Sequence, residues 1–191
     1  MNFFPTAIPD VVRIELQVFG DKRGFFLETF RADQMAVAGI PAHFVQDNHS
    51  GSRKNILRGL HYQIRQAQGK LVRAVSGEVF DVAVDLRRNS PSYGLWVGDV
   101  LSADNKKMLW IPPGFAHGFL VLSEWAEILY KTTEYYAPEW ERTLLWNDPT
   151  VGIRWPIPPG IEPVLSSKDV SGARLENADV YDQVALSTKG G

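Results

Sequence analysis

Cysteine is absent from the 191-residue chain, so no disulfide framework, thiolate nucleophile or thiolate metal site is available. A large excess of charge of either sign is also lacking, because the chain has 20 Lys and Arg residues and 22 Asp and Glu residues. It therefore has no bulk positive charge for coating nucleic acid. No apolar run is long enough to span a bilayer. The N-terminal MNFFPTAIPDVV has two prolines and no basic start, unlike a signal peptide. We therefore expect a soluble, cytoplasmic protein without nucleic-acid or membrane partners.

The remaining composition is that of a folded domain. Hydrophobic residues make up 45% of the chain and aromatic residues 12%, enough apolar surface for a substantial core. The length favours one domain, and no linker, repeat or low-complexity segment interrupts the chain. We predict a single domain over residues 1–191, with its core at about 5–170 and a C-terminal tail beyond.

Short segments with strand character recur along the chain, separated by turns rich in Gly, Pro, Asn and Ser. Extended segments are expected at 11–19, 25–30, 44–48, 56–63, 70–75, 78–86, 94–101, 107–111, 117–122 and 126–133. This spacing is typical of an antiparallel sandwich or barrel. Short helices are predicted only at the periphery, at 32–38 and near 139–142, with a wrapping segment after Pro138 and a frayed end over the last dozen residues.

The segment from Arg58 to Arg73, RGLHYQIRQAQGKLVR, carries a single histidine among cationic side chains. A neutral imidazole can take a proton from carbon, and nearby positive charge can hold the oxyanion that develops. The same charge would attract an anionic substrate. This segment therefore predicts proton-transfer chemistry on an anionic carbonyl compound.

A metal-dependent cupin is an alternative reading of the same strands. Metal-binding cupins place two histidines one residue apart, then a glutamate, then a third histidine on a later strand. Here His61-Tyr62-Gln63 lacks the second histidine, while the turn PPGFAH supplies His117. Two histidines without thiolates or further carboxylates make a weak metal site, so we expect no metal.

Several long blocks, in order, resemble the dTDP-4-dehydrorhamnose 3,5-epimerase family over about residues 5–170. The blocks are FGDKRGFFLETF (19–30), FVQDNHS (44–50), LRGLHYQ (57–63), QGKLVRAVSGEVFDVAVDLRRNSPSYG (68–94), LWIPPGFAHGFLVLS (109–123), LYKTTEYY (129–136), LLWNDPTVGIRWP (144–156) and LSSKD (165–169). The resemblance implies an all-β, cupin-type double-sheet jelly roll that forms a homodimer and uses neither metal nor cofactor. It implies an isomerase that converts dTDP-4-dehydro-6-deoxy-D-glucose to dTDP-4-dehydro-L-rhamnose, on the route to L-rhamnose in polysaccharides.

The resemblance also implies roles for individual residues. His61 is the expected base, with Asp169 as the carboxylate that fixes its tautomer, and Tyr130 is the expected acid on the opposite face. Lys70 and Arg58 are assigned to the enolate oxygen and the nearby phosphate. Strand parity places Arg58 and His61 on opposite faces, so they converge only if Gly59 marks a bulge or Arg58 precedes the regular strand.

The same resemblance extends the expected nucleotide-sugar site beyond these residues. Arg23 and Lys168 suit the diphosphate, while Gln46 and Asn48 can hydrogen-bond hydroxyls or a base edge. The full set of further substrate-binding residues is Arg23, Glu28, Gln46, Asp47, Asn48, Arg58, His117, Glu141 and Lys168.

Three alternatives stay open at this point. A mono-epimerase would invert only carbon 3 or carbon 5 of a related dTDP-4-keto-6-deoxysugar. A metal-dependent cupin oxygenase or isomerase would use His61 and His117 as ligands. A binding module would hold the sugar nucleotide without exchanging its protons.

Overall fold

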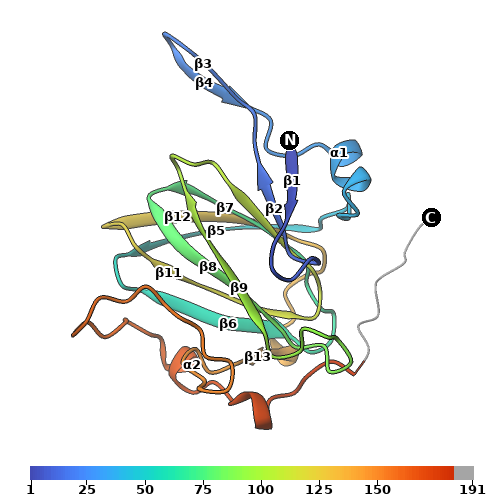
Figure 1. Cartoon of the computed structure of the whole chain (residues 1–191), viewed down its shortest axis with the longest axis vertical. Helices are drawn as coiled ribbons and strands as arrows, with labels where there is room; N and C mark the ends of the chain where they lie inside the picture. The colour runs from blue at the N-terminus through green and yellow to red at the C-terminus, as the bar shows by residue number, and fades with distance from the viewer. Residues whose placement is uncertain (183–191) are drawn as a thin grey trace.

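The computed structural model describes residues 1–182 and consists mainly of two antiparallel sheets packed face to face (Figure 1). The six-stranded sheet has the order β1-β2-β10-β7-β12-β5 and the five-stranded sheet the order β13-β6-β11-β8-β9. The strands are β1 (Asn2–Pro5), β2 (Val12–Glu15), β3 (Val18–Asp21), β4 (Gly24–Leu27), β5 (Gln46–Arg53), β6 (Leu57–Gln63), β7 (Lys70–Ser76), β8 (Glu78–Asp85), β9 (Trp96–Ser102), β10 (Met108–Ile111), β11 (Phe115–Val121), β12 (Trp125–Thr132) and β13 (Glu141–Thr143). The expected cupin-type double-sheet jelly roll is confirmed.

The core between the sheets comes from alternating side chains of the central strands. Val72 of β7 and Ile128 of β12 point inward from one sheet and meet Ala83 of β8 and Phe119 of β11 from the other. Side chains at every second position of a strand share a face, so these positions bury one apolar surface per sheet. Along part of the same interior, polar side chains replace apolar ones, and this is where the cavity described below lies.

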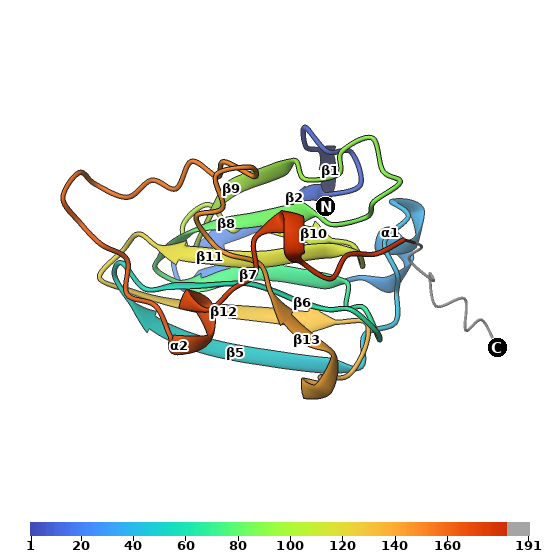
Figure 2. The ribbon, with the colours of Figure 1, turned by 90° about the horizontal axis from the view of Figure 1, so that it is seen from below.

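The C-terminal segment covers the outer face of the five-stranded sheet. Leu144, Val151, Leu175 and Tyr181 pack against Val84 and its neighbours on that face. Within this segment lies the short helix α2 (Ser167–Val170), which Figure 2 shows beside the strands of the jelly roll. The predicted wrapping segment is therefore confirmed.

The predicted frayed end starts too early in the chain. Tyr181 is only 5% exposed and its hydroxyl donates to the carbonyl oxygen of Gln63. The packing of this ring against the sheet orders the start of the last dozen residues. Residues 183–191 lie outside the described part of the chain.

The N-terminal part differs most from the sequence prediction. The strand expected at 11–19 is two strands, because β2 pairs with β1 and β10 whereas β3 pairs only with β4. Strand β1 was not predicted, since its residues combine two aromatic side chains with a terminal proline rather than an alternating pattern. The predicted helix at 32–38 is confirmed as α1 (Ala32–Val37), which buries Met35 against the outer face of the six-stranded sheet.

The β3–β4 hairpin projects from the body of the molecule (Figure 1). Phe25 and Phe26 on it are 62% and 66% exposed, so the hairpin carries a largely exposed apolar surface, with the Lys106 ammonium group 4.0 Å above the centre of the Phe25 ring. Two single turns of 3-10 helix complete the structure, at Pro138–Trp140, close to the short helix predicted near 139–142, and at Leu175–Asn177. Among residues 1–182, no helix is long and apolar enough to cross a membrane.

Candidate active site

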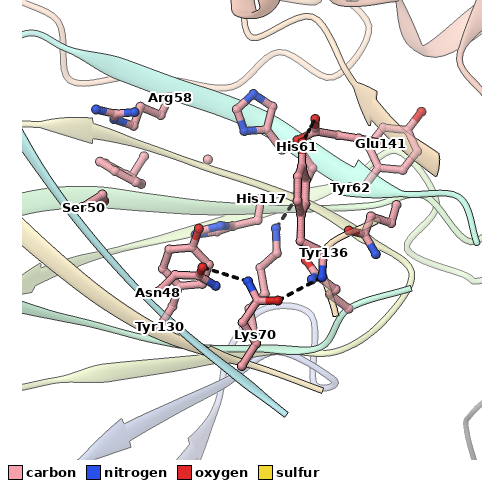
Figure 3. A pocket seen from close by; sticks show the side chains of 15 residues that line it. Asn48, Ser50, Arg58, His61, Tyr62, Lys70, His117, Tyr130, Tyr136 and Glu141 are labelled. Carbon is pink, nitrogen blue, oxygen red and sulfur yellow. Dashed lines mark hydrogen bonds between the residues drawn. The ribbon is translucent and has the colours of Figure 1, made fainter. Parts of the chain in front are cut away.

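A cavity of about 330 Å³ opens between the two sheets (Figure 3). It is lined from β5, β7 and β12 on one side and from β6, β11 and β13 on the other. Eight of the predicted site residues line it: Gln46, Asn48, Arg58, His61, Lys70, His117, Tyr130 and Glu141. Residues spread over almost a hundred positions in the sequence thus share one concave surface, as an active site requires.

A short contact at this site joins His61 and Asp169. Nε2 of the imidazole lies 2.7 Å from Oδ1 of the carboxylate, and the backbone N–H of Gly59 donates to the same oxygen at 3.1 Å. Asp169 is only 2% exposed and lies on α2, which contacts β6. Because Nε2 is engaged by the carboxylate, Nδ1 is the nitrogen left to exchange a proton with a bound molecule.

The surroundings hold this pair in a defined charge state. Burial lowers the pKa of His61, the hydrogen bond to Asp169 opposes that shift, and the positive charges of Lys168 and Lys70 add to it. Burial alone would raise the pKa of Asp169, but hydrogen bonds from His61, Ser166 and Gly59 outweigh it and keep that pKa well below its usual range. The resting pair is therefore a neutral imidazole beside a carboxylate, which is the form a base needs.

Arg58 and His61 converge because the strand carrying them is irregular. His61 pairs with His117 while Arg58 pairs with Phe119, so three steps on β6 match two on β11. One extra residue changes the side-chain parity and brings both to the cavity. Gly59 permits this with a φ of 121°, and a Cβ there would lie 2.6 Å from Cα of Gly118 on β11. Of the two explanations that strand parity left open, the structure has the irregularity at Gly59, because Arg58 already lies within β6.

Lys70 lies deep in the site, at the start of β7. Its Nζ donates to the carbonyl oxygen of His61 at 3.2 Å, and the residue is 7% exposed. Burial lowers the pKa of Lys70 to about 8, although the charges of Asp81 and Glu141 act in the opposite direction. The ammonium group therefore still carries its charge near neutral pH and is available to stabilise a developing oxyanion.

A second histidine–carboxylate pair lies next to the first. Nε2 of His117 lies 2.9 and 3.1 Å from the two carboxylate oxygens of Asp81, and both residues are buried. His117 is also the direct neighbour of His61 across β6 and β11. Within residues 1–182, no three His, Asp or Glu side chains gather in an arrangement that could hold a metal ion.

Tyr130 reaches the cavity from the sheet opposite His61. It stands on β12 between Asn48 of β5 and Val72 of β7, whereas His61 stands on β6, and Figure 3 shows the two side chains entering from different strands. Burial raises the pKa of Tyr130, the positive charge of Arg58 lowers it and Glu141 raises it. The phenol thus keeps its proton at neutral pH and can donate it.

A chain of polar contacts forms the rim of the cavity. The Gln46 amide donates to Oδ1 of Asn48 at 2.9 Å and accepts from the backbone N–H of Tyr136 at 3.0 Å (Figure 3). The Tyr136 hydroxyl donates to Glu141 at 2.9 Å, and Lys168 forms an ion pair with the same carboxylate. Amide, phenol and ion-pair groups at a cavity mouth suit a ligand with hydroxyls and negative charge.

Three predicted residues lie away from this cavity. Arg23 is on the β3–β4 hairpin, where its side chain is 90% exposed and bonded to Asp21, and Glu28 follows the hairpin near Arg31. Asp47 alternates with the cavity residues of β5, so it faces outward and pairs with Lys131. Within one described chain, these residues do not meet His61.

The sequence reasoning missed several lining residues. Ser50 lies two residues after Asn48 and four after Gln46 on the same strand, so the alternation of side chains along a strand could have identified it. Tyr136 and Gln68 lie on loops or at strand ends, where no period predicts a direction. Tyr62 and Gln63 also line the cavity, although their positions next to His61 gave no functional signal.

Comparison with known proteins gives a consistent result. The family model described as dTDP-4-dehydrorhamnose 3,5-epimerase matches residues 5–177. The dTDP-4-dehydrorhamnose 3,5-epimerase of Pseudomonas aeruginosa is 61% identical over 176 residues, which are 92% of this chain and 96% of that protein. The Escherichia coli protein of the same name is 57% identical over 171 residues, which are 88% of this chain and 91% of that protein.

Solved structures agree with the sequence relatives. A Legionella pneumophila dTDP-6-deoxy-D-glucose-3,5-epimerase, in complex with dTDP-4-keto-L-rhamnose, superposes with a TM-score of 0.91 at 47% identity, covering 96% of this chain and 99% of that one. ChmJ, a 3'-monoepimerase from Streptomyces bikiniensis in complex with dTDP-quinovose, has a TM-score of 0.84 at 33% identity, with coverages of 90% and 87%. The two-centre and one-centre enzymes therefore share this fold.

Proposed function

Because the chain belongs to the dTDP-4-dehydrorhamnose 3,5-epimerase family, we propose that the cavity between its sheets is where the reaction of that family takes place. The chain is an isomerase that epimerises dTDP-4-dehydro-6-deoxy-D-glucose at carbons 3 and 5 to dTDP-4-dehydro-L-rhamnose, in dTDP-rhamnose biosynthesis. What remains to be assigned is which of its residues carry out each proton transfer.

We infer that His61 removes the proton. A hydrogen on carbon next to a ketone is weakly acidic, because its electron pair can become the double bond of an enolate while the ketone oxygen takes the charge. Nδ1 of His61 accepts the proton, and Asp169 on the far nitrogen stabilises the imidazolium that forms. Lys70 and Arg58 place positive charge where the enolate oxygen and the diphosphate would lie.

Tyr130 returns a proton to the same carbon from the opposite face. Inversion at carbon requires an acid and a base on different sides of the sugar ring, and the observation that carries this proposal is that His61 and Tyr130 face one cavity from different sheets. After each cycle the phenolate regains a proton and the imidazolium loses one by exchange with water. These steps use only side chains of this chain, so the proposal includes neither metal nor cofactor.

We further propose that the protein is a homodimer. The β3–β4 hairpin exposes Phe25 and Phe26, and an apolar surface of this kind is typical of a contact with another chain. The family resemblance places Arg23 and Glu28 at the substrate, yet both lie away from the cavity of their own chain. A second copy whose hairpin reaches the cavity would satisfy both observations. The cytoplasmic location likewise stays a prediction.

The alternative function that the sequence left open is that of a mono-epimerase, and ChmJ is an example of a one-centre enzyme with this fold. Proton exchange separates the two. The purified, chelator-treated protein would be incubated with dTDP-4-dehydro-6-deoxyglucose in heavy water and followed by NMR. Deuterium at both carbon 3 and carbon 5 supports the two-centre reaction, and deuterium at carbon 3 or carbon 5 alone supports the mono-epimerase. Absence of exchange would contradict both and favour a binding module.

A further inference from the structure

We propose that Ser166 is a positioning residue, which holds the Asp169 carboxylate in the orientation that His61 requires. The proposal rests on the proposed role of His61 as the base. Ser166 does not line the cavity, and it belongs to the LSSKD block, in which Lys168 and Asp169 were assigned roles and the serines none.

Each oxygen of the Asp169 carboxylate has its own set of donors. Oδ1 accepts from Nε2 of His61 at 2.7 Å and from the backbone N–H of Gly59 at 3.1 Å. Oδ2 accepts from the Ser166 hydroxyl at 2.6 Å and from the Ser166 backbone N–H at 3.2 Å. Ser166 therefore holds one oxygen while the other is presented to the base, and rotation of the carboxylate would break contacts on both sides.

This arrangement matters because the element that carries Asp169 is very short. Helix α2 has only four residues, and Ser166 begins it with a reciprocal pair of bonds, since its hydroxyl also accepts from the Asp169 backbone N–H at 3.3 Å. One turn of helix provides little rigidity of its own. The Ser166 hydroxyl therefore links the backbone turn directly to the side chain that bonds His61.

Because charged groups surround the His61–Asp169 pair, the alignment of the two side chains affects how well the protonated imidazole is stabilised. Lys168, Lys70 and the Glu141 carboxylate act on His61 in addition to Asp169, and the two lysines oppose protonation of the imidazole. The Asp169 hydrogen bond is the largest influence that favours the imidazolium. Loss of its geometry would leave the protonated base less stabilised when it has just taken a proton from substrate.

The test replaces the hydroxyl in two ways. Ser166→Ala removes the hydroxyl and also weakens the start of helix α2. Ser166→Gly removes the hydroxyl as well, but glycine begins helices well, so comparison of the two variants separates the loss of carboxylate positioning from the loss of the helix cap. Ser166→Thr keeps a hydroxyl and should therefore restore both the turnover and the pKa of His61. Ser167→Ala is the matched control, because it changes the adjacent exposed serine at the first helical position, one that forms no side-chain hydrogen bond in the described structure.

Two readouts are measured on each full-length variant. The first is turnover, separated into kcat and KM. The second is the pKa of His61 from NMR titration of its imidazole, which is practical because the chain has only 4 histidines and His61→Gln identifies the signal. We expect Ser166→Ala and Ser166→Gly to lower kcat roughly 10-fold with little change in KM, as for loss of a hydrogen bond to a charged group. The pKa of His61 should fall in both variants, and Ser166→Thr should restore both quantities.

The outcomes distinguish this proposal from the one on which it rests. An unchanged kcat and His61 titration in a folded Ser166→Gly protein would overturn the positioning role, as would a rise in the pKa of His61. Near-normal turnover in His61→Ala would instead overturn the base assignment. If Ser166→Ala does not fold, Ser166→Gly and Ser166→Thr still decide the question, because both retain residues that begin helices well.

Discussion

Arg58 and His61 are three residues apart on β6, yet both side chains face the same cavity. The register explains this, since Arg58 pairs with Phe119 and His61 with His117. The irregularity lies between these two pairs, and at Gly59 within it the backbone of β6 approaches that of β11 too closely for any side chain. A cation and a base are thereby placed on one surface, which a regular strand would have separated.

Gly59→Ala should therefore damage both stability and activity. The new Cβ would lie 2.6 Å from Cα of Gly118, at a φ of 121° that favours glycine. We expect a loss of about 3 kcal/mol in the free energy of unfolding, measured with urea, together with most of the turnover. Gly160→Ala is the control, because its φ is 79° but no atom lies within 4 Å of the added carbon. A Gly59→Ala protein with normal activity would contradict the importance of the bulge.

Removal of the base or of its carboxylate should abolish most turnover without unfolding the protein. His61→Ala and Asp169→Ala are expected to lower kcat on the order of 100- to 10,000-fold, because general-base catalysis contributes that much. Deuterium uptake by the substrate is the direct measurement, and circular dichroism checks the fold. If His61→Ala exchanges protons at the normal rate, another residue is the base.

Tyr130→Phe should separate the two proton transfers. The phenyl ring keeps the packing but lacks the proton donor, so abstraction by His61 should continue while inversion slows. NMR in heavy water would then show that deuterium, returned from the His61 side, enters the substrate without inversion faster than epimerised product forms. Equal loss of exchange and inversion would indicate a different role for Tyr130.

The pH dependence should have two limbs with different origins. His61 must be neutral, and burial lowers its pKa from the ordinary 6.5, so kcat/KM should fall only as the pH drops below that value. Lys70 must be charged, and its pKa of about 8 places the alkaline fall near that pH. Tyr130 does not contribute there, because its pKa is raised from 10.

Lys70→Arg tests the alkaline limb. A guanidinium keeps its charge at all accessible pH values, so this variant should lose the fall near pH 8 even if its maximal rate is lower. The measurement is the kcat/KM profile from pH 5 to 10 in both proteins. An unchanged alkaline limb in Lys70→Arg would assign that limb to another group.

The proposed dimer predicts complementation between two inactive variants. If Arg23 acts in the cavity of a second copy, Arg23→Ala and His61→Ala chains should form mixed dimers in which one cavity has both groups intact. Mixing and refolding the two variants should therefore restore part of the activity. Phe26→Ser, which changes the exposed ring of the hairpin, should shift sedimentation toward the monomer. Absence of both effects would contradict the dimer.

Local regularities account for what could be predicted of the fold. The alternation in EVFDVAVDL is retained in β8, where Val82 and Val84 pack under the C-terminal segment and Ala83 points into the core. A period of two is a property of the strand backbone, so it can be read without knowing the partner strand. Strand β1 and the division of residues 11–19 into two strands could not be predicted, because they depend on which strands pair rather than on a local sequence pattern.

The sequence by itself determined most of the strands, the family and the candidate acid, base and cations, since residue type, spacing and ordered motifs are local properties of the chain. Only the tertiary structure decided how they meet. Asp169 reaches His61 across 108 residues, and Asp81 pairs with His117 although no periodicity links them. The outward position of Arg23 was likewise invisible to its motif. Contacts between distant segments depend on the packing of whole sheets and on bulges within them, which no local pattern encodes.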